Sequence, residues 1–136
     1  TTETADKSGN IRTPANITMD GIGVLSFFNA TIPRHLKALL KKNQLGIDDP
    51  SLFVFHQASK IALDSIARAL NIPDHKMVRN MEKVGNLVSA SVPVALKMAL
   101  TEGQAKPGDL VVLCGFGVGL SWQLCLNTSH PNIIIV

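Results

Sequence analysis

The sequence is poor in aromatic side chains and in charge: aromatic residues make up 4% and charged residues 17% of its 136 residues. The basic side chains, which give a formal net charge of +3, are dispersed, and Lys41–Lys42 is the only adjacent basic pair. A nucleic-acid surface usually clusters its basic groups and adds rings that stack on nucleotides. The composition therefore argues against nucleic acid as a partner, whereas a mild basic excess suits an acidic one.

Cysteines are few, and no long apolar run is present. Cys114 and Cys125 form neither a disulfide framework nor a metal-binding spacing, so no metal is expected and the reducing cytoplasm is the default location. No apolar run reaches the roughly 18 residues of a membrane span. The polar first residues are unlike a signal peptide. Because the chain begins with Thr1 and not with Met, we expect a fragment or a processed piece.

Hydrophobic residues make up 46% of the sequence, and their distribution divides the chain in two. Residues 1–18 are polar and rich in Thr, which predicts an N-terminal arm. Residues 19–136 carry the apolar segments and are expected to form a single domain. The apolar excess predicts elements that are buried on both faces, or a surface that another polypeptide covers.

Helical and strand patterns alternate along residues 19–136. An apolar stretch runs from Gly21 to Phe28, and Pro33 interrupts it. Helical spacing of apolar residues is found in three segments, at about 36–46, 58–70 and 91–100. Short apolar strands are predicted at 52–55, 110–113 and 120–126. Residues 115–119 (GFGVG) are predicted to form a tight loop, and the alternation as a whole predicts an α/β sheet covered by helices.

His56 directly follows the predicted strand 52–55. Ligands of α/β sheets bind beyond the carboxyl ends of the strands, so His56, Asn86 and the glycine loop could converge on one point. Each feature also has a plainer interpretation, because a strand-end His is more often structural and an Asn after Gly is often a turn former. The glycines lack the GxGxxG spacing and precede a strand, so we expect no dinucleotide or other cofactor. Cys114, within VVLC, is typical of a small buried hydrophobe.

Several motifs occur together in a fixed order. They are HQA after an apolar strand, GN followed by SASVPVAL, then KPGDLVVL and GFGVGLSW, preceded by MDG with Val24 and Phe27–Phe28. In this order the motifs resemble the C-terminal half of a β-ketoacyl-acyl carrier protein synthase III, a member of the thiolase superfamily. The resemblance covers about residues 19–126.

The resemblance implies a fold and a set of catalytic residues. The fold would be a mixed five-stranded sheet with helices on both faces, half of a duplicated thiolase fold. Enzymes of this family condense an acyl-CoA primer with malonyl-acyl carrier protein through a Cys-His-Asn triad, in which His56 matches the histidine and Asn86 the asparagine. The nucleophilic cysteine belongs to the N-terminal half, and neither Cys114 nor Cys125 matches it.

This sequence departs from the family pattern at three places. The usual HQAN ends in Ser59, and the usual basic residue two places further on is Ile61, although Lys60 is adjacent. The usual GNTSAAS reads GNLVSAS, with Leu87–Val88 in place of two hydroxyl residues. The family's glycine triplet, which would supply a backbone N–H to the acyl oxyanion, reads Gly117, Val118, Gly119.

The resemblance also implies partners. These are an N-terminal half that carries the cysteine, an acyl carrier protein docked through Lys60, and acyl-CoA and malonyl thioester substrates. The complete enzyme is expected to be a cytoplasmic homodimer in fatty acid or related biosynthesis, and this chain alone is expected to be inactive. Two alternatives remain: a non-catalytic thiolase-fold interaction module, and a non-decarboxylating acyltransferase of the same superfamily, against which Asn86 argues.

Overall fold

The computed structural model describes residues 2–6, 9–16, 20–117 and 119–128, and its main sheet is mixed. The strands of this sheet, in spatial order, are β3 (Leu52–Phe55), β4 (Leu110–Gly117) and β5 (Ser121–Thr128). β3 is parallel to β4, and β4 is antiparallel to β5. A separate antiparallel pair is formed by β1 (Thr4–Ala5) and β2 (Ile11–Arg12). The expected α/β class is confirmed, with the five described strands divided between two sheets where a single sheet was expected.

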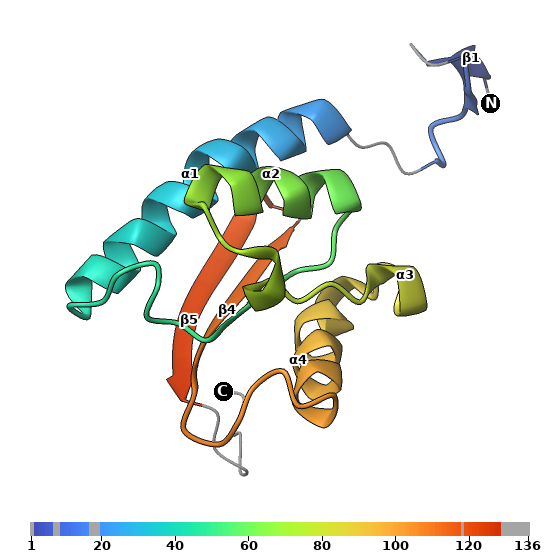
Figure 1. Ribbon diagram of the computed structural model, residues 1–136. Coiled ribbons are helices and arrows are strands. Elements are labelled where there is room, and N and C mark those ends of the chain that lie inside the picture. Colours follow the sequence, from blue (N-terminus) through green and yellow to red (C-terminus); the bar gives the residue numbers. More distant parts are fainter. Residues whose placement is uncertain (1, 7–8, 17–19, 118, 129–136) are drawn as a thin grey trace.

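Helices cover both faces of the main sheet (Figure 1). One face packs against α1 (Gly21–Lys42) and α2 (Lys60–Leu70), and the other against α4 (Ser91–Thr101). The connection from α2 to α4 contains η1 (Asp74–Lys76), α3 (Met81–Val84) and η2 (Val88–Ala90). Among the described residues, no helix combines the length and the apolarity that crossing a membrane would need.

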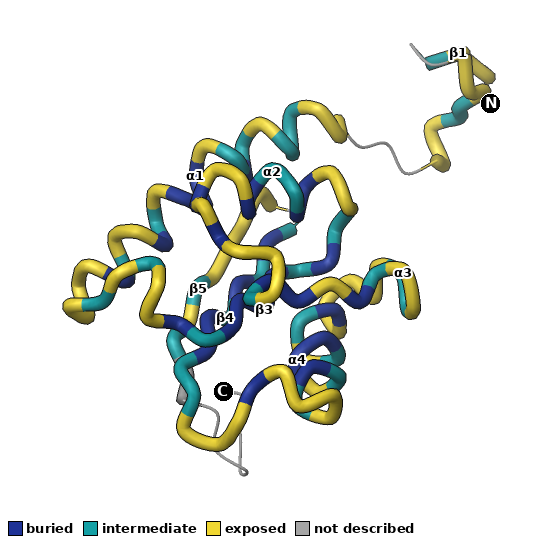
Figure 2. The backbone as a smooth tube through the Cα atoms, in the orientation of Figure 1, coloured by how far each residue is buried: buried dark blue, intermediate teal, exposed yellow. Residues whose placement is uncertain are grey.

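The alternation of side chains along β3 produces these two layers. Phe53 and Phe55 belong to the core beneath α1 and α2, whereas Leu52 and Val54 belong to the core beneath α4. All four side chains are buried, and Figure 2 shows burial concentrated along β3 and β4. A strand that is buried on both faces reads as a continuous apolar run, which is why the segment 52–55 was recognisable.

The first helix continues through Pro33, so the predicted interruption is wrong. Proline inside a helix removes one hydrogen bond and costs about 3 kcal/mol. Buried residues recur every four positions on this helix, at Phe28, Ile32, Leu36 and Leu40. Burying each such side chain contributes about 1.5–3 kcal/mol. The stripe as a whole therefore outweighs the local effect of the proline.

The fourth strand is longer than predicted. β4 continues to Gly117, so Gly115–Gly117 belong to the ladder and not to a loop. Gly115 pairs with Gln123 and Gly117 with Ser121. Phe116, between the two glycines, is buried against α1 and α2, and its packing fixes the strand register. β5 then begins at Ser121.

The fifth strand carries the single tryptophan of the chain. The ring of Trp122 stacks on His35, with ring centroids 4.9 Å apart and planes 9° apart. The edge-on contact of Trp122 with Phe27 has a centroid distance of 5.5 Å. Because His35 and Phe27 both belong to α1, these rings hold that helix against β5.

Candidate active site

His56 lies at the carboxyl end of β3, one residue beyond the strand. Its backbone N–H donates to the carbonyl of Cys114 at 2.8 Å, and its own carbonyl accepts from the N–H of Ala58 at 2.9 Å. The half-buried imidazole meets the ring of Phe116 edge-on, with centroids 5.3 Å apart and planes at 90°. Burial lowers the pKa of His56, because desolvation disfavours the charged imidazolium. The site therefore favours a neutral imidazole, which can donate one N–H bond.

Gln57 is fully buried and braces the strand end. Its Nε2 group donates to the carbonyls of Phe55, at 2.9 Å, and Val78, at 3.2 Å. Its Oε1 atom accepts from the N–H of Asn80 at 3.1 Å. The side chain thus ties the end of β3 to the segment that enters α3, and its role here is structural. No local pattern predicts this brace, because two of its three partners, Val78 and Asn80, lie 21 and 23 residues away in the sequence.

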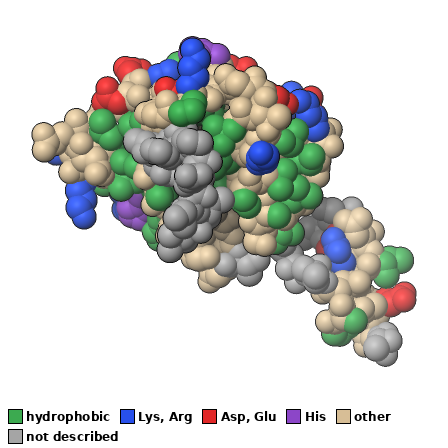
Figure 3. Space-filling view, turned by 90° about the horizontal axis from the view of Figure 1, so that it is seen from below, with side chains coloured by type: hydrophobic (Ala, Val, Ile, Leu, Met, Phe, Trp, Pro, Cys, Tyr) green, Lys and Arg blue, Asp and Glu red, His purple; other side chains and the backbone are tan. Residues whose placement is uncertain are grey.

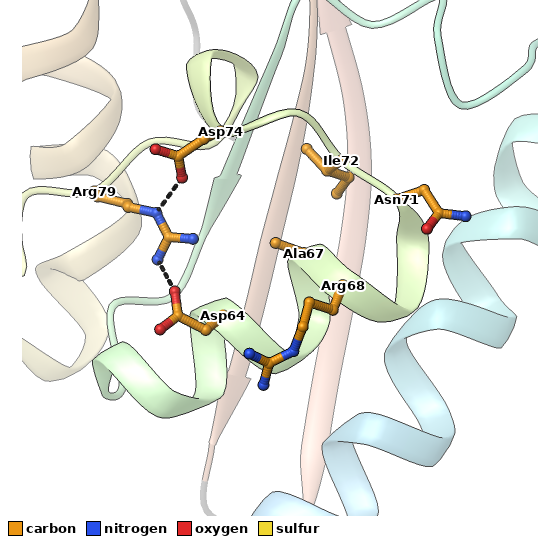
Figure 4. A pocket seen from close by; sticks show the side chains of 7 residues that line it. All are labelled: Asp64, Ala67, Arg68, Asn71, Ile72, Asp74 and Arg79. Atoms are coloured by element: carbon orange, nitrogen blue, oxygen red, sulfur yellow. Dashed lines mark hydrogen bonds and ion pairs between the residues drawn. The ribbon is translucent and has the colours of Figure 1, made fainter.

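A second clamp holds the same connecting segment against α2 (Figure 4). Arg79 forms ion pairs with Asp64 of α2, at 2.8 Å from Nη1, and with Asp74 of η1, at 3.0 Å from Nε. These side chains line a depression of about 290 Å³ on the surface. Arg79 and Gln57 together fix the chain between α2 and α3 from two sides.

Asn86 lies on an exposed loop that follows Gly85. Gly85 has φ 68° and ψ −163°, which only glycine adopts readily, so it directs the chain out of α3. The Oδ1 atom of Asn86 accepts from the N–H of Val88 at 2.9 Å and from the hydroxyl of Ser91 at 3.4 Å. Its Nδ2 group makes no hydrogen bond with any residue that the structure describes. The amide therefore forms a turn through its oxygen and leaves its NH₂ group available as a donor.

The glycine hairpin lies beside His56. Gly117 ends β4, and Gly119 has φ +140°, a backbone conformation that favours glycine. A side chain at Gly115 or Gly117 would meet open space, in front of a depression of about 250 Å³. Val118, the expected middle residue of the oxyanion loop, lies outside the described residues. The contact between His56 and Phe116 brings the imidazole next to this hairpin.

The predicted site residues are brought together only in part. His56 and the glycine hairpin are in direct contact through Phe116. No hydrogen bond or ring contact joins His56 to Asn86 within the described part of the chain. Gln57, next to His56, accepts from the N–H of Asn80, the N-cap residue of the helix α3 that precedes Asn86.

Lys60 is the first residue of α2 and is exposed. The preceding Ser59 caps this helix, because its hydroxyl accepts from the N–H of Ala62 at 3.1 Å. Ser and Asn are both good N-cap residues, so the change from HQAN to HQAS leaves the helix start intact. Ile61 is 68% exposed. The family's basic position is thus an apolar surface residue here, with Lys60 beside it.

The two cysteines differ in environment. Cys114 is fully buried on β4, and burial raises the pKa of its thiol to about 12. Because the thiolate is the nucleophilic form, this group is unsuited to attack a thioester at neutral pH. Cys125 is exposed on β5.

Comparison with known proteins identifies the family to which the chain belongs. Residues 40–128, more than half of the chain, match the family described as 3-oxoacyl-[acyl-carrier-protein (ACP)] synthase III C terminal. The chain is 40% identical over 119 residues to the β-ketoacyl-[acyl-carrier-protein] synthase III of Synechocystis sp., covering 88% of this chain and 36% of that protein. It is 42% identical over 108 residues to the enzyme of the same name from Rhodopirellula baltica, covering 79% and 31%.

A solved structure shows the same fold. A 2.1 Å crystal structure of a 3-oxoacyl-(acyl-carrier-protein) synthase III superposes with a TM-score of 0.89 at 38% identity, covering 94% of this chain and 38% of that one. The fold is that of a thiolase-like half. The chain belongs to the family of 3-oxoacyl-[acyl-carrier-protein] synthase III C-terminal domains, and it spans about a third of the length of the relatives that it matches.

Proposed function

We propose that this chain is the C-terminal part of an acyltransferase of the 3-oxoacyl-[acyl-carrier-protein] synthase III type. The enzyme condenses an acyl thioester with malonyl-acyl carrier protein, in fatty acid or related biosynthesis. The observation that carries the proposal is the desolvated His56 at a strand end, beside the glycine hairpin, in a chain of this family. Desolvation supports the neutral donor that the chemistry requires.

In this proposal His56 and Asn86 act on the malonyl thioester. When its terminal carboxylate leaves as CO₂, the electron pair of the broken C–C bond moves toward the thioester oxygen and forms an enolate. An N–H from the imidazole and an N–H from the amide of Asn86 stabilise the developing charge. The NH₂ group of Asn86, which donates to none of the described residues, and the neutral imidazole are donors of the required kind.

The second half of the reaction needs a nucleophile from another part of the enzyme. We infer that an N-terminal half supplies a cysteine, which carries the acyl group as a thioester. The enolate carbon attacks this acyl carbonyl, and backbone N–H groups at residues 117–119 bind the oxyanion before the cysteine leaves as thiolate. The chain alone would therefore be inactive.

The surface supports an association with a further polypeptide. Large hydrophobic side chains are exposed on several elements, at Ile11, Ile22, Ile61, Leu87, Val88, Leu120 and Trp122. Figure 3 shows hydrophobic side chains gathered between charged groups on one face. The N-terminal half, and a second copy in a homodimer, are the partners that this proposal assigns. A cytoplasmic location belongs to the same proposal, because both cysteines are free thiols.

Lys60 is proposed to dock the acidic acyl carrier protein, since it is exposed at the start of α2, close in sequence to His56. Exposed ion pairs are worth about 1 kcal/mol or less and are screened by salt. We expect Lys60→Glu to raise KM for malonyl-acyl carrier protein several-fold, with little effect on a small malonyl thioester. Equal effects on both substrates would refute the docking role.

The central experiment supplies the missing half. The N-terminal two thirds of the Synechocystis relative, fused ahead of this chain, gives a complete enzyme in which condensation can be measured. We expect 3-oxoacyl product from the fusion, none from the chain alone, and none from the fusion with His56→Ala. A non-catalytic interaction module would leave the folded, acylated fusion unable to condense. A non-decarboxylating acyltransferase would transfer the acyl group to an alcohol or amine without releasing CO₂.

A further inference from the structure

Ser91 has a buried hydroxyl, and its two hydrogen bonds with described residues both go to the Asn86 loop. It is the first residue of α4 and is 2% exposed. Its Oγ atom accepts from the N–H of Leu87 at 3.0 Å and donates to Oδ1 of Asn86 at 3.4 Å. A hydroxyl has one proton, and since the Leu87 bond uses a lone pair, that proton remains for Asn86.

The bonds to Oδ1 determine which way the Asn86 amide faces. The backbone N–H of Val88 can only donate, so the amide atom 2.9 Å from it must be the oxygen. The Ser91 hydroxyl adds a second donor to the same atom. A flipped amide would place its NH₂ group against the Val88 N–H. The NH₂ group therefore points away from Val88 and Ser91, where no described residue accepts from it.

We propose that Ser91 is a positioning residue for Asn86. By holding the amide oxygen, it keeps the amide NH₂ group presented to the malonyl thioester. The inference rests on the proposed function, because it assigns to Asn86 the role of an enolate donor. A purely structural alternative exists, in which Ser91 only closes the turn through the N–H of Leu87.

The test uses the complete enzyme and two assays. The first measures CO₂ release from malonyl thioester, and the second measures acylation of the cysteine by mass spectrometry. Ser91→Ala should lower CO₂ release roughly tenfold to a hundredfold, because a misplaced catalytic group loses its alignment. Acylation should stay within about twofold, as it does not pass through the enolate. Ser89→Ala removes an exposed hydroxyl from the same loop and should change neither rate.

A double-mutant cycle separates positioning from folding. If Ser91 acts through Asn86, Ser91→Ala should have almost no further effect on CO₂ release in the Asn86→Ala variant. An equal loss in both backgrounds, or a parallel loss of acylation, would overturn the inference. Ser91→Cys keeps the side-chain shape with a weak donor, so it should also reduce CO₂ release, and a wild-type rate would count against Ser91. The proposed function fails separately, if Asn86→Ala itself releases CO₂ normally.

Discussion

His56 and Asn86 are held in opposite ways. The backbone N–H of His56 is bonded to β4, and the imidazole of His56 is half-buried. The neighbouring Gln57 is fully buried and makes three side-chain hydrogen bonds. Asn86 is exposed on a loop and is held through one atom of its side chain. The contacts that hold the strand end at His56 and Gln57 all come from this chain. Asn86 is exposed among the described residues, as expected if the proposed N-terminal half covers this loop in the complete enzyme.

The largest expected effect is that of a substitution at Asn86 on the rate of CO₂ release. Asn86→Asp in the complete enzyme should fold normally, because a carboxylate oxygen can still accept from Val88 and Ser91. It replaces an N–H donor by a negative charge beside the forming enolate, so CO₂ release should fall by at least about 10²–10³. The enzyme should still become acylated, as judged by mass spectrometry. A parallel fall of both activities would mean that Asn86 serves the fold.

The brace at the strand end should matter most for stability. Gln57→Leu leaves a buried N–H of Asn80 and two buried carbonyls without their partner, and each unsatisfied group costs about 1–3 kcal/mol. We expect the free energy of unfolding, measured by urea titration, to fall by at least about 3 kcal/mol. Gln104→Leu, at an exposed position, is the control and should change it by less than about 0.5 kcal/mol. Similar values for the two variants would show that the brace is not formed.

A substitution at Val88, in the Asn86 loop, should increase the free energy of unfolding. Val88 has φ 54° and is 74% exposed, and a β-branched residue in the left-handed region is unfavourable by roughly 1–2 kcal/mol. Val88→Asn, which tolerates this conformation, should raise the free energy of unfolding by about 1 kcal/mol. Val88→Ala removes the side chain without making the left-handed backbone favourable, so it should gain much less. Equal gains would trace the effect to the lost apolar surface.

The smallest effect concerns pH. Because burial lowers the pKa of His56 in the folded chain, the unfolded chain binds a proton first as the pH falls. The contribution of His56 is therefore present above its unfolded pKa, about 6.5, and is lost as the pH falls toward the folded value. His56→Gln should flatten the dependence of the free energy of unfolding on pH between about 7.5 and 5. An unchanged slope for His56→Gln would mean that the imidazole is solvated.

Local patterns predicted the elements that local forces decide. The strand 52–55, the helix beginning near Ser59 and the helix containing Pro93 in its first turn were all readable from the sequence. The continuation of α1 through Pro33 could not be predicted locally. The buried residues of α1 pack against elements that are distant in the sequence, and this burial outweighs the local effect of the proline. Gly115–Gly117 were predicted as a loop from composition, but cross-strand pairing and the burial of Phe116 extend β4.

The candidate site shows the same division. His56 was recognisable from its place after an apolar run, and the family motifs pointed to Asn86. The supporting roles of Gln57 and Ser91 were not recognised. For Gln57 two of the three partners are more than 20 residues away, and for Ser91 the role depends on which amide atom of Asn86 faces it. A hydrogen-bond partner across such a distance leaves no periodic trace in the sequence.

The stack of His35 on Trp122 gives the chain a built-in optical probe. Trp122 is the only tryptophan, so the ultraviolet-excited emission of the chain originates at one place, the seam between α1 and β5. Trp122 is 38% exposed, so its emission is sensitive to any molecule that binds next to α1 and β5. Detachment of α1, or binding of another polypeptide next to β5, should change the fluorescence emission of Trp122, so either event can be followed without an added label.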